Sequence, residues 1–221
     1  MAEAIVKTNE IKLNGREFWR GGCESIQLAD VGEIRTPLGK PSWFEAKDRI
    51  RGSKLKVKNL GTITIDSQRT TKVDFLGSVN LAKVFPLGKG SLGYEAVVER
   101  KLELMYMEVE TDDMVRAVND SPAVREKLKD WGEDARICIG VFLVVTAETS
   151  KHFAVNTSHE AEFTVYGVTF KPKLTVGASG DTTIKLEKGS CFGYAIAKPI
   201  WDEPKPKNAK RLKDLRFDNH T

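Results

Sequence analysis

Two stretches of the chain alternate apolar and polar positions with a period of two. In residues 72–81 the odd positions are Val73, Phe75, Gly77, Val79 and Leu81. In residues 94–104 the even positions are Tyr94, Ala96, Val98, Arg100, Leu102 and Leu104, and the odd positions are mostly charged. A segment with Gly and Pro, residues 84–93, joins the two stretches. This pattern predicts a long β-hairpin.

Two interpretations fit this hairpin. Each arm has about the ~9–11 residues that a tilted strand needs to cross a bilayer. An apolar face opposite a charged face is typical of a strand between lipid and a water-filled lumen. A sheet with one face on a protein core produces the same alternation. Alternation alone favours the soluble sheet, so other parts of the chain must decide.

The rest of the chain predicts further strands and one pair of helices. Residues 136–149 form the strongest strand, and residues 161–170 return as its partner after a polar segment, which makes a second long hairpin. Between the hairpins, Thr111 and Ser121-Pro122 are helix-start signals and Gly132 is a stop, which predicts a helical hairpin over 111–131. Shorter strands are expected at 25–35, 54–58, 62–65, 182–186 and 191–197, with a short helix within residues 1–20.

Composition narrows the class of protein. The 221 residues carry a formal charge of +4, which suits an anionic surface and is too weak to indicate nucleic acid binding. The first residues show no secretory signal, and the longest apolar run, 137–145, is too short for a spanning helix, so we expect a cytoplasmic protein. Cys23, Cys138 and Cys191 are too few for a disulfide framework or a zinc site and are expected to be buried.

No catalytic constellation is apparent. The segment 88–93 fits G-x-G-x-x-G, but a strand rather than a helix is expected after it, which excludes a dinucleotide site. His152 and His159 have no partner ligands at metal-binding spacing and are interpreted as loop residues. We therefore predict that the protein is not an enzyme and that it uses neither a cofactor nor a metal.

A loop with basic and aromatic residues is the best candidate for a contact with lipid. Trp43 and Phe44 suit the membrane interface, where amphipathic aromatic rings settle. Basic residues nearby suit anionic headgroups, at about 1 kcal/mol for each charge near such a surface. The candidate lipid-binding residues are Trp43, Phe44, Lys40, Lys47, Arg49 and Arg51. A solvated strand face would explain the basic residues equally well.

Several segments, taken in order, resemble the gasdermin pore-forming family. Residues 74–81, Asp-Phe-Leu-Gly-Ser-Val-Asn-Leu, are similar to the family's first long hairpin, and residues 128–137 to its passage from helix to the second hairpin. Residues 182–197 are similar to its closing strands, with a Gly-Ser turn before an apolar strand. Pro41-Ser42-Trp43-Phe44 lies where the family has an aromatic, basic loop. The order and spacing hold over about residues 25–200.

The resemblance implies an α+β fold: a gasdermin N-terminal-like domain over 1–200, with a twisted, mostly antiparallel sheet, short helices and two extendable hairpins. It implies a soluble, latent form that binds acidic lipids such as phosphoinositides or cardiolipin, assembles into a large ring and closes a β-barrel pore that kills the cell. The first membrane-spanning hairpin would use Val73, Phe75, Val79, Leu81, Tyr94, Ala96, Val98 and Leu102. The second would use Val141, Leu143, Val145, Phe163 and Val165.

The chain departs from animal gasdermins because it has no room for their large repressor domain. It resembles the short bacterial and fungal members, for which the resemblance implies activation by a protease or by an incompatible variant of the protein, acting at the plasma membrane or inner membrane. Residues 201–221 are predicted to be a basic, flexible tail. Three interpretations of this tail stay open: a self-inhibitory peptide, an arm that binds headgroups, or an unstructured end. The alternative function is a soluble β-rich module that binds lipid or protein without forming pores.

Overall fold

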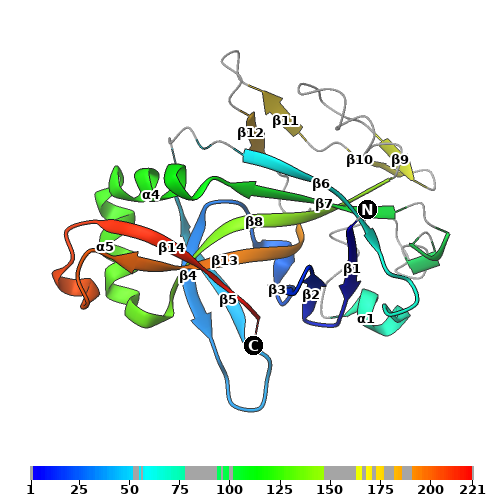
Figure 1. The fold of residues 1–221 in the computed structure, drawn as a ribbon, viewed down its shortest axis with the longest axis horizontal. Helices are drawn as coiled ribbons and strands as arrows, with labels where there is room; N and C mark the ends of the chain where they lie inside the picture. Colours follow the sequence, from blue (N-terminus) through cyan, green and yellow to red (C-terminus); the bar gives the residue numbers. More distant parts are fainter. Residues whose placement is uncertain are drawn as a thin grey trace.

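A computed structural model describes residues 2–51, 55, 57–77, 94–95, 97–99, 102–146, 163–165, 168–170, 173–176, 182–185 and 191–220. Helices and strands are mixed around a sheet-rich core, which confirms the predicted α+β class (Figure 1). All pairings between the described strands are antiparallel except that of β1 with β6. No described helix is long and apolar enough to cross a membrane.

Four long strands form the centre of the main sheet. They are β6 (Val57–Ile65), β7 (Leu102–Val109), β8 (Ala135–Thr146) and β13 (Cys191–Trp201). Each is antiparallel to the next, so β6 and β13, the two outer strands of this group, run in opposite directions. The expected strand at 136–149 is therefore confirmed as β8. Its buried residues, such as Val141 and Leu143, explain the continuous apolar face in the sequence.

The first twenty residues close these four strands into a ring. They form three short strands, β1 (Ala2–Val6), β2 (Glu10–Leu13) and β3 (Arg16–Trp19), where a helix had been predicted. β1 pairs with β6 on one side of the group, and β3 pairs with β13 on the other. Ala4, Val6, Ile11 and Leu13 are buried and stand two positions apart in β1 and β2, so a period of two in burial is present in a segment that polar residues dominate.

The two predicted helices are confirmed. α4 (Thr111–Asn119) and α5 (Pro122–Trp131) connect β7 to β8, with Pro122 in the first turn of α5 and Gly132 at its end in the left-handed region (φ 59°). They lie at one end of the four strands (Figure 1). The remaining elements are β4 (Asp30–Arg35), β5 (Trp43–Arg49), α1 (Lys72–Leu76), β9 (Phe163–Val165), β10 (Val168–Phe170), β11 (Lys173–Val176), β12 (Thr182–Lys185), β14 (Leu212–Asp218) and the 3₁₀ turns η1 (Cys23–Ser25), η2 (Gly132–Asp134) and η3 (Pro206–Asn208).

An aromatic cluster joins the ring to both chain ends. The ring of Phe18 on β3 makes edge contacts with Tyr106, Phe142 and Phe217, at centroid distances of 5.3, 4.8 and 5.3 Å. Tyr106 and Phe142 stack at 4.5 Å, in a space that Gly140 leaves open, since a Cβ there would come within 2.8 Å of the Tyr106 ring. Such pairs add about 0.5–1.5 kcal/mol each beyond area burial.

The prediction of a strand over 72–81 is wrong for its first half, because residues 72–76 form the helix α1. Thr71 caps this helix: its side chain accepts a hydrogen bond from Asp74 N at 3.0 Å and donates to the Asp74 carboxylate at 2.8 Å. Short alternation cannot distinguish a strand from one helical turn that buries only Phe75. The Thr-x-x-Asp cap was the signal that would have distinguished them.

The expected second arm, 94–104, is also partly helical. Residues 94–95 and 97–98 are helical, with Glu99 N donating to Glu95 O at 2.9 Å, and the strand β7 begins only at Leu102. In the second predicted hairpin, β9 and β10 pair with each other, whereas β8 pairs with β7, β4 and β13. The expected pairing of 136–149 with 161–170 is therefore replaced by a short local hairpin.

The sequence predicted a flexible tail after residue 200. This prediction is wrong for residues 212–218, which form the strand β14. This strand pairs with β13 from Ile196 to Trp201. Asn119 holds the start of β14, donating to Leu212 O at 2.9 Å and accepting from Leu212 N at 2.8 Å. Of the basic residues that suggested a solvated tail, Lys213 and Arg216 are exposed on this strand, beside Leu215 and Phe217, which pack on the sheet, and the others precede it.

Candidate functional site

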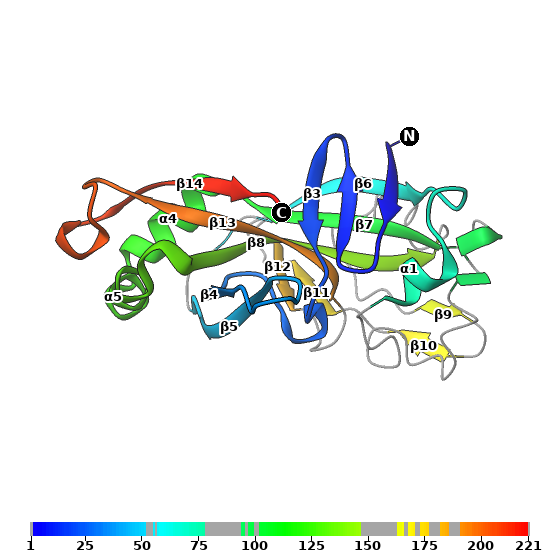
Figure 2. The ribbon, with the colours of Figure 1, turned by 90° about the horizontal axis from the view of Figure 1, so that it is seen from below.

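Two long insertions leave the four-stranded group at one end. The first, residues 66–101, connects β6 to β7, and the second, residues 147–190, connects β8 to β13. Cross-strand pairs at this end are Thr64 with Glu103, Leu102 with Thr146, and Leu143 with Cys191. The helices α4 and α5 occupy the opposite end (Figures 1 and 2). The first insertion contains most of the first predicted hairpin, 72–104, whereas the second contains only the returning arm of the second predicted hairpin, 161–170, because most of the arm 136–149 is β8.

The start of the first insertion is held against the N-terminal strands. The Asp74 carboxylate in α1 pairs with Lys7 Nζ at 3.2 Å and accepts from Thr8 Oγ1 at 3.2 Å. Partial burial acts to raise the Asp74 pKa, but hydrogen bonds from Thr71, Lys7 and Thr8 and the Lys7 charge outweigh it, so the pKa is lowered. At neutral pH this carboxylate is therefore ionised and available to its partners.

Arg20 contacts the start of the first insertion and the strand β13 that follows the second. Its side chain is fully buried, and its guanidinium donates to the carbonyl oxygens of Lys7 at 2.5 Å, Asp74 at 2.7 Å and Phe75 at 2.8 Å. It also lies 4.4 Å from the ring centroid of Phe192, two residues after the second insertion. Burial lowers the Arg20 pKa to about 10, which leaves the group charged at neutral pH. Sequence analysis missed Arg20 because its partners are backbone carbonyls distant in the chain.

The predicted membrane-spanning residues have different environments. In the first hairpin Val73 is 76% and Val98 51% exposed, whereas Phe75 and Leu102 are buried. Tyr94 is partly buried and donates to Thr70 O at 3.1 Å. In the second hairpin Val141, Leu143 and Val145 are in the core. Val79, Leu81, Ala96 and the tip at 88–93 lie outside the described residues, as do His152, His159 and the side chains of Phe163 and Val165.

The predicted lipid-binding residues belong to the β4–β5 hairpin, which projects from the body (Figure 1). Trp43 is 37% exposed, but Phe44 is 2% exposed, so Phe44 is a core residue in this form. The alternation of β5 puts neighbouring residues on opposite faces, which explains why only one of the two aromatic rings reaches solvent. The residue that sequence analysis missed is Leu38, fully exposed at the hairpin tip.

The basic residues of this hairpin divide into two groups. Lys47 pairs with Glu33 and lies 5.6 Å from the Trp131 ring centroid, and Arg49 pairs with Asp30 at 2.6 Å. Lys40 is exposed in the loop at the hairpin tip, whereas Arg51 is exposed two residues after β5, at the base of the hairpin. Lys47 and Arg49 therefore make ion pairs within the fold, and Lys40 is the basic residue that lies at the same end of the hairpin as the exposed Leu38 and Trp43.

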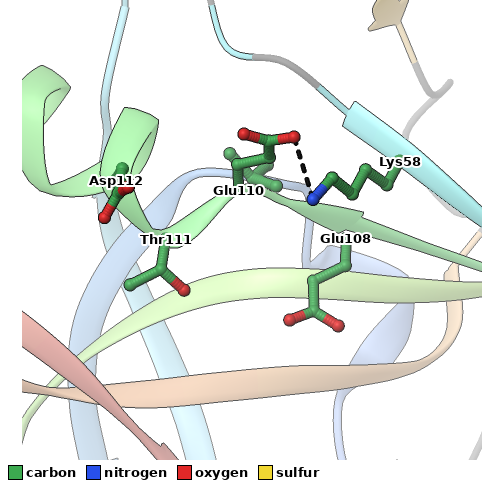
Figure 3. A pocket seen from close by; sticks show the side chains of 6 residues that line it. Lys58, Glu108, Glu110, Thr111 and Asp112 are labelled. Atoms are coloured by element: carbon green, nitrogen blue, oxygen red, sulfur yellow. Dashed lines mark ion pairs between the residues drawn. The ribbon is translucent and has the colours of Figure 1, made fainter.

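A hollow beside the start of α4 is lined by three acidic side chains together with Lys58, Val109 and Thr111 (Figure 3). Glu110 pairs with Lys58 across it at 2.9 Å, and Glu108 and Asp112 lie on either side. Within the described part of the chain no cluster of His, Cys, Asp and Glu is arranged to hold a metal ion. The acids after β7 fit the positive end of the α4 dipole, which accounts for Asp112 and Asp113 without a ligand.

Comparisons with protein-family models, with curated proteins and with solved structures found no match to this chain. The arrangement of the two insertions and of the β4–β5 hairpin is therefore the basis for any functional assignment. The three cysteines are buried and unpaired by disulfides, as the sequence predicted. Burial raises the thiol pKa values of Cys138 and Cys191 well above their usual range, which makes these thiols unreactive at neutral pH.

Proposed function

We propose that this protein is a gasdermin-like pore former, which binds acidic lipids, assembles into a ring and inserts two hairpins into a membrane. The observation that carries the proposal is that both insertions leave the same end of one antiparallel four-stranded group. Extension of β6 into β7, and of β8 into β13, would continue ladders that already exist. Both new hairpins would then point in one direction, as a shared pore wall requires.

The insertions are long enough for this task. They contain 36 and 44 residues, between Ile65 and Leu102 and between Thr146 and Cys191. A hairpin that crosses a bilayer needs two strands of about 9–11 residues and a turn. An open sheet edge in lipid would leave backbone groups unpaired, so insertion becomes favourable only when many copies close a ring. Self-association is therefore part of the proposed mechanism.

The β4–β5 hairpin is the proposed first contact with the membrane. Leu38 and Trp43 would enter the interface while Lys40, at the same end of the hairpin, meets anionic headgroups such as those of phosphoinositides or cardiolipin. The latent protein would be cytoplasmic, and the active ring would reside in the plasma membrane or an inner membrane. A protease or an incompatible variant of the chain is the proposed trigger. Neither an enzymatic step nor a cofactor forms part of the proposal.

A second candidate is a soluble β-rich module that binds lipid or protein without inserting. The observation in its favour is that β8, the predicted membrane-facing arm, is one of seven strands in a closed ring and that its apolar side chains are buried. Under this alternative the insertions would form a binding surface and the ring would never open.

Release of dye from vesicles separates the two candidates. Vesicles with 20–40% anionic lipid (roughly physiological surface charge) and neutral vesicles are each mixed with the intact protein and with protein treated briefly with protease. The pore former releases dye from anionic vesicles and forms large rings visible by electron microscopy. Binding to the same vesicles with neither dye release nor assembly, in all treatments, would favour the soluble module.

A further inference from the structure

We propose that the N-terminal meander, β1 to β3 (residues 2–19), is a removable guard over the two edges by which one copy of this chain pairs with the next. This inference rests on the proposed pore-forming function and adds the interface and its control. The partner surface is a second copy of the chain. The edge of β13 in one copy would pair with the edge of β6 in its neighbour.

Strand directions make this pairing possible. β6 and β13 are the outer strands of the central four, and they run in opposite directions. When copies stand side by side, β13 of one copy is therefore antiparallel to β6 of the next. Each contact uses two different edges, a head-to-tail arrangement that generates a ring once the rotation between copies closes.

A single segment covers both edges. On β6, β1 pairs with Ile63, Thr64 and Ile65, the last residues before the first insertion. On β13, Trp19 of β3 pairs with Tyr194, three residues after Cys191 begins the strand. β14 pairs with β13 only from Ile196 onward, farther from the insertions. Displacement of residues 2–19 would thus expose both edges at once, at the end where the new hairpins must form.

The ladder contacts of the guard are few, although its side chains are well packed. Its backbone pairing with the central four strands involves three residues of β6 and one residue of β13. Such edges are templates for pairing with another chain, and proteins commonly cover them. Most of the attachment comes from buried side chains, including Ile11, Phe18 and Trp19. An assembly that displaces the guard must therefore cover this apolar surface as well as pair the two edges.

Arg20 is the residue that links the guard to the first insertion and to β13. It follows β3 directly, and its guanidinium binds the carbonyl oxygens of Lys7, in the β1–β2 turn, and of Asp74 and Phe75, in α1. Its contact with Phe192 ties the same group to β13. α1 is part of the first insertion, and its movement away from Arg20 would remove two of these acceptors. The first insertion and the guard would therefore be released together.

A reversible cross-link tests the guard. Glu3 and Thr64 face each other on β1 and β6, and neighbouring strands lie about 4.7–4.9 Å apart, within the range that a disulfide spans. The double variant Glu3→Cys/Thr64→Cys, oxidised, should form rings and release dye from anionic vesicles roughly tenfold more slowly or worse, with recovery after reduction. The matched control is Lys12→Cys/Glu17→Cys, a pair within the meander. Its oxidation should leave assembly unchanged.

The outcomes distinguish this inference from the proposed function. If the wild type releases dye and the oxidised Glu3–Thr64 cross-link does not slow it, the guard is refuted and the pore former stands. If the wild type never releases dye, the pore-forming function is refuted. In that case the guard is judged without membranes, in Arg20→Gln protein carrying the same cysteine pair. Oligomers after reduction and monomers after oxidation, by mass photometry, support the guard, and monomers in both states overturn it.

Discussion

The guanidinium of Arg20 lies over the ring of Phe192, with Cζ 4.4 Å from the centroid. The two residues are far apart in sequence, and each adjoins a segment that the proposed mechanism must move. Arg20 ends the N-terminal meander, and Phe192 is the second residue of β13. The contact therefore joins the N-terminal strands to the strand that follows the second insertion.

Replacement of Arg20 by Lys should destabilise the protein although the charge is kept. Lysine lacks the planar fork that reaches Lys7 O, Asp74 O and Phe75 O, and each buried carbonyl left unpaired costs about 1–3 kcal/mol. We expect a loss of roughly 2–4 kcal/mol in urea unfolding. Arg16→Lys is the control, since Arg16 also contacts a ring, that of Phe217, but is exposed. Equal unfolding midpoints for the two variants would contradict the role of Arg20.

The attachment of α1 should weaken in acid because of Asp74. Its pKa in the folded protein is lowered below the unfolded value of about 3.9, so its contribution to stability is present above that value and is lost as the pH falls through the folded pKa. The difference in unfolding free energy between wild type and Asp74→Asn should therefore be largest near neutral pH and shrink below about pH 4. A difference that stays constant from pH 3 to pH 7 (roughly the window set by) would show that the ion pair with Lys7 contributes nothing.

Gly193→Ala should disturb the packing of the meander on β13. A Cβ at this position would lie 2.5 Å from Ile11 Cδ1 and 3.2 Å from Trp19 O, so the side chain and the strand must both shift. We expect a loss of about 1–3 kcal/mol in thermal or urea unfolding. Gly21→Ala is the matched control, because its nearest neighbour would be 3.5 Å away, an ordinary contact. Destabilisation of the control by the same amount would refute the steric explanation.

Asn119→Ala should loosen the C-terminal strand. The variant removes both hydrogen bonds to the Leu212 backbone and leaves that backbone without its partner, at a cost of about 1–3 kcal/mol. Faster hydrogen exchange over residues 212–218 is the expected signature, with exchange in β8 unchanged. Asp120→Ala, one position along and exposed, provides the control. Normal protection of Leu212 in Asn119→Ala protein would show that the pairing with β13 holds β14 by itself.

Leu38→Asp should reduce binding to anionic vesicles without loss of stability, since Leu38 is fully exposed. Removal of an apolar side chain from the interface and addition of a negative charge both act against the contact, by about 1–3 kcal/mol in total. Phe44→Ala is the contrasting variant: Phe44 is buried, so its loss should lower the melting temperature. Vesicle sedimentation measures binding, and undiminished binding of Leu38→Asp would remove the hairpin tip from the proposal.

Some parts of the fold could be predicted because they depend on local patterns. The helix pair at 111–131 was marked by Ser121-Pro122 and Gly132, and β8 by its long apolar face. Other parts depend on distant partners. Residues 72–76 became a helix because the Thr71 cap and the burial of Phe75 outweigh a short alternation, and residues 212–218 became a strand because β13 offers an edge.

The candidate site divides in the same way. Charge and aromatic content indicated the β4–β5 hairpin, but only the fold shows that Phe44 faces the core while Leu38 and Trp43 reach solvent. Arg20 could not be found from the sequence, since a buried arginine that binds carbonyls leaves no motif.

By itself, the sequence determined where the helix pair begins and ends and that β8 is a long strand with an apolar face. These properties depend on residue types within a few positions of one another. Only the tertiary structure decided that both insertions leave the same end of the central strands and that a single N-terminal segment pairs with both outer strands of this group. The physical reason is that strand order and edge pairing are chosen by backbone hydrogen bonds and packing between residues distant in the chain, for which no local pattern exists.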